Sequence, residues 1–267
     1  MPGDNNGCIE VSNLRFSYAQ DCVIKGCSFR VSRGVLCCLL GRNGSGKSTL
    51  LRLINGTLQP DSGQVTVDGI DVHSTQRAIT GRKLGFVPQK HNHVFPYRVL
   101  DMVVMGRTPY LDIFSRPSRE DYLIADKALD VMGIPHLRER SCAEISGGEE
   151  QLVFIARAIT QEATYFLLDE PTSHLDFANQ HMILTTIRRL VKEQKCAAVV
   201  AMHDPNLSLR FADHIVMLDN GTIIHEGPTG EVMTEDNLEQ LYDIKVKVAD
   251  VGGGGKCILP RSAAPSL

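Results

Sequence analysis

Apolar residues in the first third of the chain come in short runs or alternate with polar residues, which is the pattern of β-strands. Polar breaks separate the stretches 9–18, 23–32 and 35–40, and the same texture continues at 63–72 and 83–89. We therefore expect the first third of the chain to be rich in β-structure.

The spacing of apolar residues changes to that of helices between about 97 and 160. Within this region Ser118 is followed by Glu120 and Asp121, and acidic side chains are favoured in the first turn of a helix. A further helix is predicted to open after Ser-Gly-Gly at 146–148. The pattern indicates a helical insertion.

Strand and helix patterns alternate from residue 164 onward. Apolar strands are predicted at 164–170 and 196–202, and helices at 177–194 and 205–212. Continuous apolar strands between helices are typical of a parallel sheet that is covered on both faces.

Two hairpins are predicted near the C-terminus. Asn220-Gly221 lies between two β-like runs, and this dipeptide is the strongest short signal for a tight hairpin. The last twenty residues, 248–267, predict a short hairpin followed by a frayed end.

Composition narrows the class of protein. The chain has 267 residues, of which 43% are hydrophobic and 22% are charged, which fits one large globular domain or a domain with an insertion. A net charge of -3 argues against a general nucleic-acid binder. The apolar runs fall far short of the ~20 residues that span a bilayer, so at a membrane another chain would provide the span. The first ten residues do not resemble a secretory signal, and we expect a cytosolic location.

The cysteines and two clustered histidines do not indicate a metal site. The eight cysteines form no C-x-x-C pair and none of the paired spacings of zinc sites. Cys37 and Cys38 lie on an apolar strand, where we expect reduced, buried thiols. His91 and His93 share a stretch without further ligands, and a solvated loop is the better interpretation.

The stretch 41–49, GRNGSGKST, fits the phosphate-binding pattern G-x-x-x-x-G-K-[ST] between an apolar strand and a helical pattern. Glycines let the backbone wrap phosphates, Lys47 would reach the β- and γ-phosphates, and Ser48 would offer a hydroxyl to Mg²⁺. An ordinary glycine-rich turn is a poor alternative in this strand–loop–helix context. The expected nucleotide-binding residues here are Gly41, Asn43, Gly44, Ser45, Gly46, Lys47, Ser48 and Thr49. A second glycine-rich stretch, 251–257, lacks the first glycine of the pattern, has Cys257 where Ser or Thr is needed, and predicts a loop.

A pair of carboxylates ends the apolar strand 165–168. In a nucleotide site Asp169 would serve Mg²⁺ and Glu170 would take a proton from the attacking water. The local pattern fits the plain end of a strand equally well, and the phosphate-binding stretch favours the catalytic interpretation.

The stretch 145–150, ISGGEE, raises a question of charge. A glycine-opened helix start presents free N–H groups and the positive end of the helix dipole, which suits a phosphate, whereas two carboxylates repel one. Ser146 and Glu149 have the spacing of a capping box, in which the carboxylate reaches back to the N–H of the serine.

These motifs, taken in order, resemble those of the ATP-binding-cassette ATPases over roughly residues 9–245. The resemblance implies an α/β fold, that of the P-loop NTPases, with a RecA-like mixed or parallel sheet core, an N-terminal antiparallel β-subdomain and an inserted helical subdomain. It implies a single domain in which 9–95 and 160–245 form the nucleotide-binding core, 96–159 the helical subdomain and 246–267 a C-terminal extension. ATP and Mg²⁺ would be the ligands.

The resemblance assigns roles to further residues. Tyr18 would stack on adenine, although an aromatic packed in the sheet is a serious alternative. Gln89 would touch Mg²⁺ or water and sense the helical insertion. His203 would bond the γ-phosphate and hold Glu170 and water in line. A lone histidine is more often part of a core, but this one ends a strand at the edge where α/β folds bind ligands.

The resemblance also implies a head-to-tail homodimer that sandwiches two ATP molecules. Ser146, Gly147, Gly148 and Glu149 would face the partner's ATP, and Asp176 would cross the same interface. The family most often has Gln where this chain has Glu149, so we expect weaker ATP-driven dimerisation.

The insertion, with MGRTPY at 105–110, resembles that of ATPase subunits of bacterial importers for iron chelates, haem, cobalamin and molybdate-type oxyanions. Separate transmembrane permease subunits would dock on it, and an extracytoplasmic solute-binding protein would act indirectly. The chain would lie on the cytoplasmic side of the cell membrane, with no nucleic-acid partner. An exporter ATPase and a soluble cassette ATPase outside transport are the alternatives. An adenylate-kinase-like or GTPase P-loop enzyme would have no reason to carry SGG before a helix and His203 after a strand.

Overall fold

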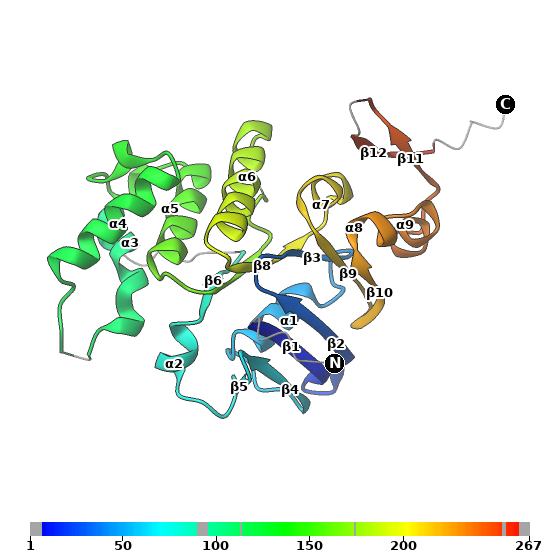
Figure 1. Cartoon of the computed structure of the whole chain (residues 1–267), viewed down its shortest axis with the longest axis horizontal. Helices are drawn as coiled ribbons and strands as arrows, with labels where there is room; N and C mark the ends of the chain where they lie inside the picture. The colour runs from blue at the N-terminus through cyan, green and yellow to red at the C-terminus, as the bar shows by residue number, and fades with distance from the viewer. Residues whose placement is uncertain (1–6, 90–95, 113, 174, 253–254, 262–267) are drawn as a thin grey trace.

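The computed structural model describes residues 7–89, 96–112, 114–173, 175–252 and 255–261 of the 267-residue chain. Two sheets dominate the described part (Figure 1), and their strands confirm the expected β-rich first third. His91 and His93, residues 253–254 of the second glycine-rich stretch and the last six residues lie outside the described ranges.

The first sheet is antiparallel and has the order β2-β1-β4-β5. Its strands are β1 (Cys8–Tyr18), β2 (Asp21–Ser32), β4 (Ser62–Val67) and β5 (Ile70–Asp71). The alternating burial of β1 and β2 confirms the alternation seen in the sequence and turns one face of this sheet toward the core.

The second sheet is mixed and has the order β10-β9-β3-β8-β7-β6. Pairing is parallel from β9 through β6, and only the edge strand β10 runs antiparallel to its neighbour. The strands are β3 (Leu36–Leu40), β6 (Leu84–Val87), β7 (Tyr165–Asp169), β8 (Ala197–Met202), β9 (His214–Asp219) and β10 (Thr222–Pro228). Every residue of β3, β7 and β8 is buried, as expected for parallel strands covered on both faces.

The two faces of the mixed sheet pack against different layers. Cys37 and Leu39 of β3 face α1 (Lys47–Ile54) and the antiparallel sheet, whereas Cys38 and Leu40 face the other helices. Both cysteines are fully buried and free, as predicted, and burial raises the pKa of the Cys38 thiol to about 12. The helix α1 is therefore enclosed between two sheets, which fixes the position of its N-terminus.

The remaining helices pack on the other face of the mixed sheet and beyond both of its edges (Figure 1), except Arg77–Gly81, which lies beside β6. They are α2 (Arg77–Gly81), α3 (Val99–Val104), α4 (Arg119–Val131), α5 (Gly147–Thr160), α6 (Phe177–Glu193), α7 (Pro205–Phe211), α8 (Thr229–Val232) and α9 (Glu235–Tyr242), with 3-10 helices η1 (Met105–Tyr110), η2 (Pro135–Leu137) and η3 (Cys142–Glu144). The expected helical stretch between 97 and 160 is present as several separate α- and 3-10 helices.

The first helix of that stretch ends earlier than the sequence pattern suggests. After Val104 the backbone tightens into η1, which contains Gly106 and Pro109. Gly106 packs so closely on α5 that an added Cβ would lie 2.2 Å from the carbonyl oxygen of Arg157. This close approach, together with the missing N–H of Pro109, replaces a continuous α-helix by a 3-10 segment.

Arg107, the next residue of η1, is a buried junction between helices. Its guanidinium bonds Oδ1 of Asp121 at 2.9 Å, the carbonyl oxygen of Thr160 at 3.1 Å and Oε2 of Glu162 at 2.6 Å. Asp121 in turn completes a capping box with Ser118, which confirms the expected acidic start of α4. One side chain thus joins η1, the start of α4 and the end of α5.

Both predicted hairpins are present. Asn220 and Gly221 have φ values of 45° and 78°, the positive angles that a type I′ turn needs at both positions, and they connect β9 to β10. Near the C-terminus β11 (Val246–Asp250) pairs antiparallel with β12 (Lys256–Pro260).

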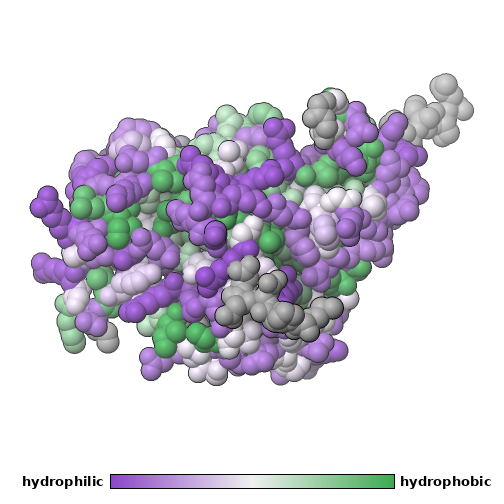
Figure 2. All heavy atoms as spheres, viewed as in Figure 1, coloured by the Kyte–Doolittle hydropathy of each residue, from purple (hydrophilic) through white to green (hydrophobic). Residues whose placement is uncertain are grey.

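Figure 2 shows that the viewed face is mainly hydrophilic, with apolar side chains in small separate groups. Among the described residues no helix combines the length and the apolar character needed to cross a bilayer.

Candidate nucleotide site

The glycine-rich loop after β3 has the backbone of a phosphate cradle. An added Cβ on Gly41 would lie 2.3 Å from the carbonyl oxygen of Leu218, so the chain can pass there only as glycine. Gly46 has a φ of 105° and occupies the N-cap of α1. These two positions turn the N–H groups at the start of α1 toward the loop, which is the arrangement that binds anions.

Lys47, the first residue of α1, is buried under this loop. Its Nζ donates to the carbonyl oxygens of Gly41 at 2.8 Å and Arg42 at 3.0 Å. Burial lowers the pKa of Lys47, while the carboxylates of Glu170 and Asp169 oppose that shift. The ammonium group is therefore held inside the loop, where a phosphate would compete for it.

Ser48 and Asp169 meet at the ends of α1 and β7. The Ser48 hydroxyl donates to Oδ1 of Asp169 at 2.9 Å. Oδ2 of Asp169 is buried and has no hydrogen-bond partner among the described residues. Burial raises the pKa of Asp169, and repulsion from Glu170 adds to that shift. An orphaned carboxylate oxygen beside a hydroxyl is a donor set that suits a hard divalent cation such as Mg²⁺.

Glu170 receives hydrogen bonds on a single oxygen. Oε2 accepts from Nε2 of Gln89 at 2.9 Å and from the hydroxyl of Ser173 at 2.9 Å, and Nδ1 of His203 lies 3.6 Å away. The residue has a φ of 49°, in the left-handed region, and its N–H donates to the carbonyl oxygen of Ala201. The strands β6, β7 and β8 thus bring Gln89, Glu170 and His203 together from three distant parts of the sequence.

Ser173 is a site residue that the sequence motifs do not indicate. It lies in the SHLD stretch, 173–176, in which the sequence assigns a role only to Asp176; His174 lies outside the described residues. The signal that could have found Ser173 is its spacing, because a hydroxyl three residues after a strand-end carboxylate can reach back to it in a turn. The backbone confirms such a turn, since the Ser173 N–H donates to the carbonyl oxygen of Glu170 at 3.1 Å.

Two cavities meet at these side chains. One of about 370 Å³ is lined by the glycine-rich loop, Lys47, Ser48 and Thr49, with Tyr18 at its side. The other, of about 340 Å³, is lined by Ser173, His203 and their neighbours. Asn43, Gln89 and Glu170 line both. A bound molecule in the first cavity would therefore have its reacting end at Glu170.

Tyr18, the last residue of β1, is 43% exposed, and its ring meets Phe16 edge-on at 4.7 Å. The partly exposed ring lines the first cavity. Tyr18 is not a residue of the sheet interior.

The capping box predicted for α5 is confirmed. Glu149 Oε2 accepts from the N–H and from the hydroxyl of Ser146, both at 2.8 Å, while Ser146 Oγ accepts from the N–H of Glu149 at 3.3 Å. The hydrogen bond from the Ser146 backbone lowers the pKa of Glu149, so the side chain stays charged at neutral pH. Ser146 and Gly147 are exposed at the tip of the helix.

This helix tip lies apart from the chain's own phosphate loop. Among the described residues that line the two cavities there is none from 146–149. Gly148 packs on Leu175, where an added Cβ would come within 3.3 Å of a methyl group, and Asp176 caps α6 through the N–H of Asn179 at 2.8 Å. Ser173, which contacts Glu170, and Leu175, which contacts Gly148, therefore lie between Glu170 and the tip of α5.

Comparisons with known proteins agree with this geometry. A family model described as ABC transporter matches residues 24–173. The molybdate import ATP-binding protein of Haemophilus influenzae is 37% identical over 240 residues, which cover 90% of this chain and 89% of that protein.

Two solved structures are similar over most of the chain. A transporter described as being of the metal-chelate type, in an inward-facing conformation, is 34% identical with a TM-score of 0.84, covering 96% of this chain and 98% of that one. A dimeric ATP-binding cassette in a post-hydrolysis state, with ADP and phosphate bound, is 26% identical with a TM-score of 0.75, covering 83% and 98%. The glycine-rich loop, the family model and the agreement in fold lead to one conclusion: the chain belongs to the ABC transporter family, and it is an ATP-binding ATPase of that family.

Proposed function

We propose that this chain powers a membrane importer for a metal chelate or related solute, by hydrolysing ATP between two copies of itself. Relatives named for the import of molybdate, iron chelatin or cobalamin, and a similar structure of the metal-chelate type, suggest this class of cargo. The observation that carries the proposal is the convergence of Gln89, Glu170, Ser173 and His203 where the cavity beside Lys47 meets the second cavity.

Binding of ATP would use the residues of the first cavity. Tyr18 would stack on the adenine, the N–H groups of 43–49 would surround the phosphates, and Lys47 would exchange its two carbonyl partners for phosphate oxygens. Ser48 and Asp169 would hold Mg²⁺, with Gln89 beside them. The ion would neutralise charge on the phosphate oxygens.

Hydrolysis would depend on how Glu170 is held. The hydrogen bonds from Gln89 and Ser173 fix Oε2, so the carboxylate is oriented before the attacking water binds. The carboxylate can then take a proton from that water. His203, whose Nδ1 lies 3.6 Å from the same oxygen, would donate to the γ-phosphate and keep Glu170, the attacking water and the γ-phosphate in line.

A second copy would complete the site. The tip of α5 suits an anion yet lines neither cavity of its own chain. We propose a head-to-tail homodimer in which Ser146, Gly147, Gly148 and Glu149 meet the partner's ATP and Asp176 lies at the same interface. Residues 9–95 and 160–245 would form the nucleotide-binding core, 96–159 the helical subdomain and 246–267 an extension.

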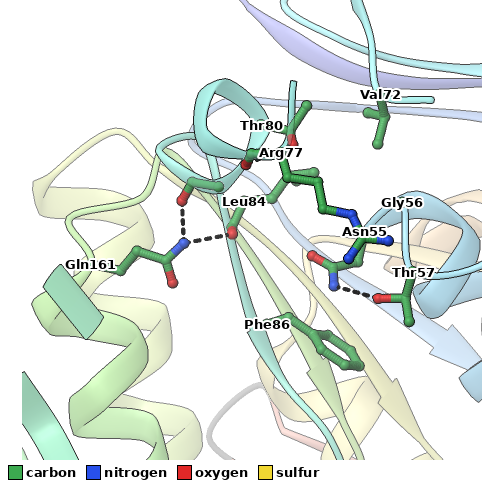
Figure 3. A pocket seen from close by; sticks show the side chains of 10 residues that line it. Asn55, Gly56, Thr57, Val72, Arg77, Thr80, Leu84, Phe86 and Gln161 are labelled. Atoms are coloured by element: carbon green, nitrogen blue, oxygen red, sulfur yellow. Dashed lines mark hydrogen bonds between the residues drawn. The ribbon is translucent and has the colours of Figure 1, made fainter. Parts of the chain in front are cut away.

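The permease would dock on the helical insertion and reach an adjoining groove of about 270 Å³, between α2, which contacts η1 of the insertion, and Gln161 at the C-terminal end of α5 (Figure 3). Gln161 joins its two sides, because its amide donates to the carbonyl oxygens of Gly81 and Leu84. Figure 3 shows Arg77 extending over the groove near Asn55, with Phe86 of β6 below them. A short helix from the permease seated here would touch the strand that leads to Gln89 and the helix that begins at Ser146.

The chain would then lie on the cytoplasmic side of the cell membrane, with a solute-binding protein acting on the far side.

Two measurements test this proposal. The Glu170→Gln variant should bind ATP, hydrolyse it hardly at all and accumulate as an ATP-bound dimer; wild-type turnover would remove Glu170 from the role of general base. The chain should also co-purify with the polytopic membrane protein encoded beside it and be stimulated by it, and Arg77→Glu should lower the ratio of stimulated to unstimulated turnover. If no such membrane protein co-purifies with the chain or stimulates its ATPase activity, the importer proposal is refuted.

A further inference from the structure

The C-terminal part of the chain contacts the loop that carries His203. Tyr242, the last residue of α9, donates its hydroxyl to the backbone carbonyl oxygen of His203 at 3.0 Å. Tyr242 is half-buried, and its burial raises the pKa of the phenol far above the ordinary value. The hydroxyl therefore stays protonated, and able to donate, at neutral pH.

A second contact comes from the hairpin β11–β12. The side-chain amide of Asn206 donates to the carbonyl oxygen of Ile258 at 3.1 Å and accepts from the N–H of Ile258 at 2.7 Å. An amide that pairs with both backbone groups of one residue imitates a neighbouring strand. Ile258 is buried in the core cluster that also contains Leu207, so the pairing is backed by apolar packing.

Asn206 lies only three residues after His203, and the loop between them is stiff. The carboxylate of Asp204 caps α7 by accepting from the N–H groups of Asn206 at 2.7 Å and Leu207 at 3.2 Å. A shift of Asn206 would therefore be passed to the backbone of His203.

The ring of His203 needs this support, because its own surroundings hold it loosely. The side chain is 54% exposed, and its Nδ1 lies 3.6 Å from Glu170, beyond the length of a good hydrogen bond. Its backbone carbonyl oxygen, by contrast, accepts a hydrogen bond from Tyr242. The position of the ring therefore depends on where the loop is fixed.

The C-terminal part is itself anchored on α9. Glu239 accepts from the N–H of Val246 at 3.2 Å, and Glu235 accepts from the N–H of Val248 at 2.9 Å and pairs with Arg261. Tyr242 and Ile258 thus belong to one connected piece, which lies beside α7 in Figure 1.

We propose that Tyr242 and Asn206 are positioning residues, through which the C-terminal residues 235–252 and 255–260 hold His203 within reach of Glu170 and the terminal phosphate of ATP. This inference rests on the role proposed above for His203, and it gives the C-terminal extension a part in the reaction. Neither residue touches the phosphate; each acts through the backbone of the His203 loop.

The test compares variants of the full chain by their ATPase kinetics. Tyr242→Phe removes one oxygen, and Asn206→Ala removes both contacts with Ile258. Each should lower kcat about tenfold or more, since a displacement of about 1 Å in a catalytic group can cost up to about a hundredfold, while the KM for ATP stays within about twofold. Asn206→Asp keeps the acceptor for the Ile258 N–H and should recover part of the loss.

Tyr110→Phe is the matched control. It removes a hydroxyl that donates to a backbone carbonyl oxygen, that of Gln161, at 3.1 Å, away from His203. A general loss of stability would affect both Tyr→Phe variants alike, whereas the proposed role affects kcat only in Tyr242→Phe.

A double variant separates positioning from a structural role. In single-turnover measurements, Tyr242→Phe combined with His203→Ala should be no slower than His203→Ala alone, because the positioned group is already absent. Wild-type kcat in Tyr242→Phe and Asn206→Ala, or losses that multiply with that of His203→Ala, would overturn the inference. Wild-type turnover in His203→Ala would instead overturn the proposed role of His203 itself.

Discussion

Glu149 offers a prediction in which the charge and the fold act in opposite directions. Its carboxylate caps α5 in the free chain through two hydrogen bonds from Ser146. In the proposed dimer the same carboxylate would lie about 6 Å from a phosphate charge, where repulsion costs about 0.7 to 3 kcal/mol at effective dielectric constants of about 80 down to 20. The substitution Glu149→Gln removes that repulsion.

The cap should survive the substitution almost intact. A glutamine side-chain oxygen can accept the same bonds from Ser146, because capping boxes use Glu or Gln. What is lost is the attraction between a negative charge and the helix dipole, about 0.3 to 1 kcal/mol. We therefore expect the monomer to unfold slightly more easily while the ATP-bound dimer becomes tighter.

The dimer contains two such contacts, so the gain is counted twice. At the low end this is about 1.4 kcal/mol per dimer, which corresponds to a tenfold smaller dissociation constant. Sedimentation equilibrium with ATP would measure it, with both proteins carrying Glu170→Gln to stop hydrolysis. Raising the salt concentration should shrink the difference, because ions screen charges that are partly exposed.

Glu144→Gln is the control for this experiment. Glu144 is an exposed carboxylate in η3, just before α5, and its removal changes the net charge equally without touching the cap. It should leave dimerisation nearly unchanged. An unchanged or weaker dimer in Glu149→Gln, or an equal gain in Glu144→Gln, would refute the reasoning.

Three further predictions concern the loop, the turn and the helical junction. Lys47→Ala should abolish ATP hydrolysis and weaken nucleotide binding, measured by fluorescence titration, and near-normal turnover would exclude the assigned phosphate site. Ser173→Ala should lower kcat about three- to tenfold without changing ATP affinity, because Glu170 loses one of the bonds that orient it. Asp121→Asn should destabilise the fold by about 2–3 kcal/mol in urea unfolding, since Arg107 keeps its burial but loses a partner. The hydrogen bond from the Ser118 N–H and the nearby Arg107 depress the pKa of Asp121, so its contribution is present at neutral pH and is lost as pH falls below the ordinary carboxyl range. The difference in the free energy of unfolding between wild type and Asp121→Asn should therefore shrink at acid pH. A difference that persists at acid pH would contradict the ion-pair explanation.

The parts of the site that were predictable are those with a local physical cause. The loop at 41–49 follows a fully buried strand and contains glycines where the backbone turns or approaches a neighbour, and these demands are visible in a short stretch of sequence. The capping box of Ser146 and Glu149 and the turn at Asn220-Gly221 depend on neighbours two or three residues apart. Pattern and spacing suffice for such features.

The parts that were not predictable depend on contacts between distant segments. The early end of α3 follows from the packing of Gly106 against Arg157, which no periodicity reports. Tyr242 and His203 are 39 residues apart, and Asn206 and Ile258 are 52 apart. The resemblance to a family supplied the roles of Gln89 and His203, whereas the order of the strands, which brings these residues to Glu170, appears only in three dimensions.

The left-handed backbone of Glu170 has a consequence for engineering this chain. A non-glycine residue at a φ of 49° costs on the order of 1–2 kcal/mol relative to an unstrained one. Glu170→Gly would relax the turn, but it would also lose the hydrogen bonds from Gln89 and Ser173 and remove the group proposed to activate water. Stability and activity are therefore separate properties at this position, and a screen for more stable variants must include ATP turnover as a criterion.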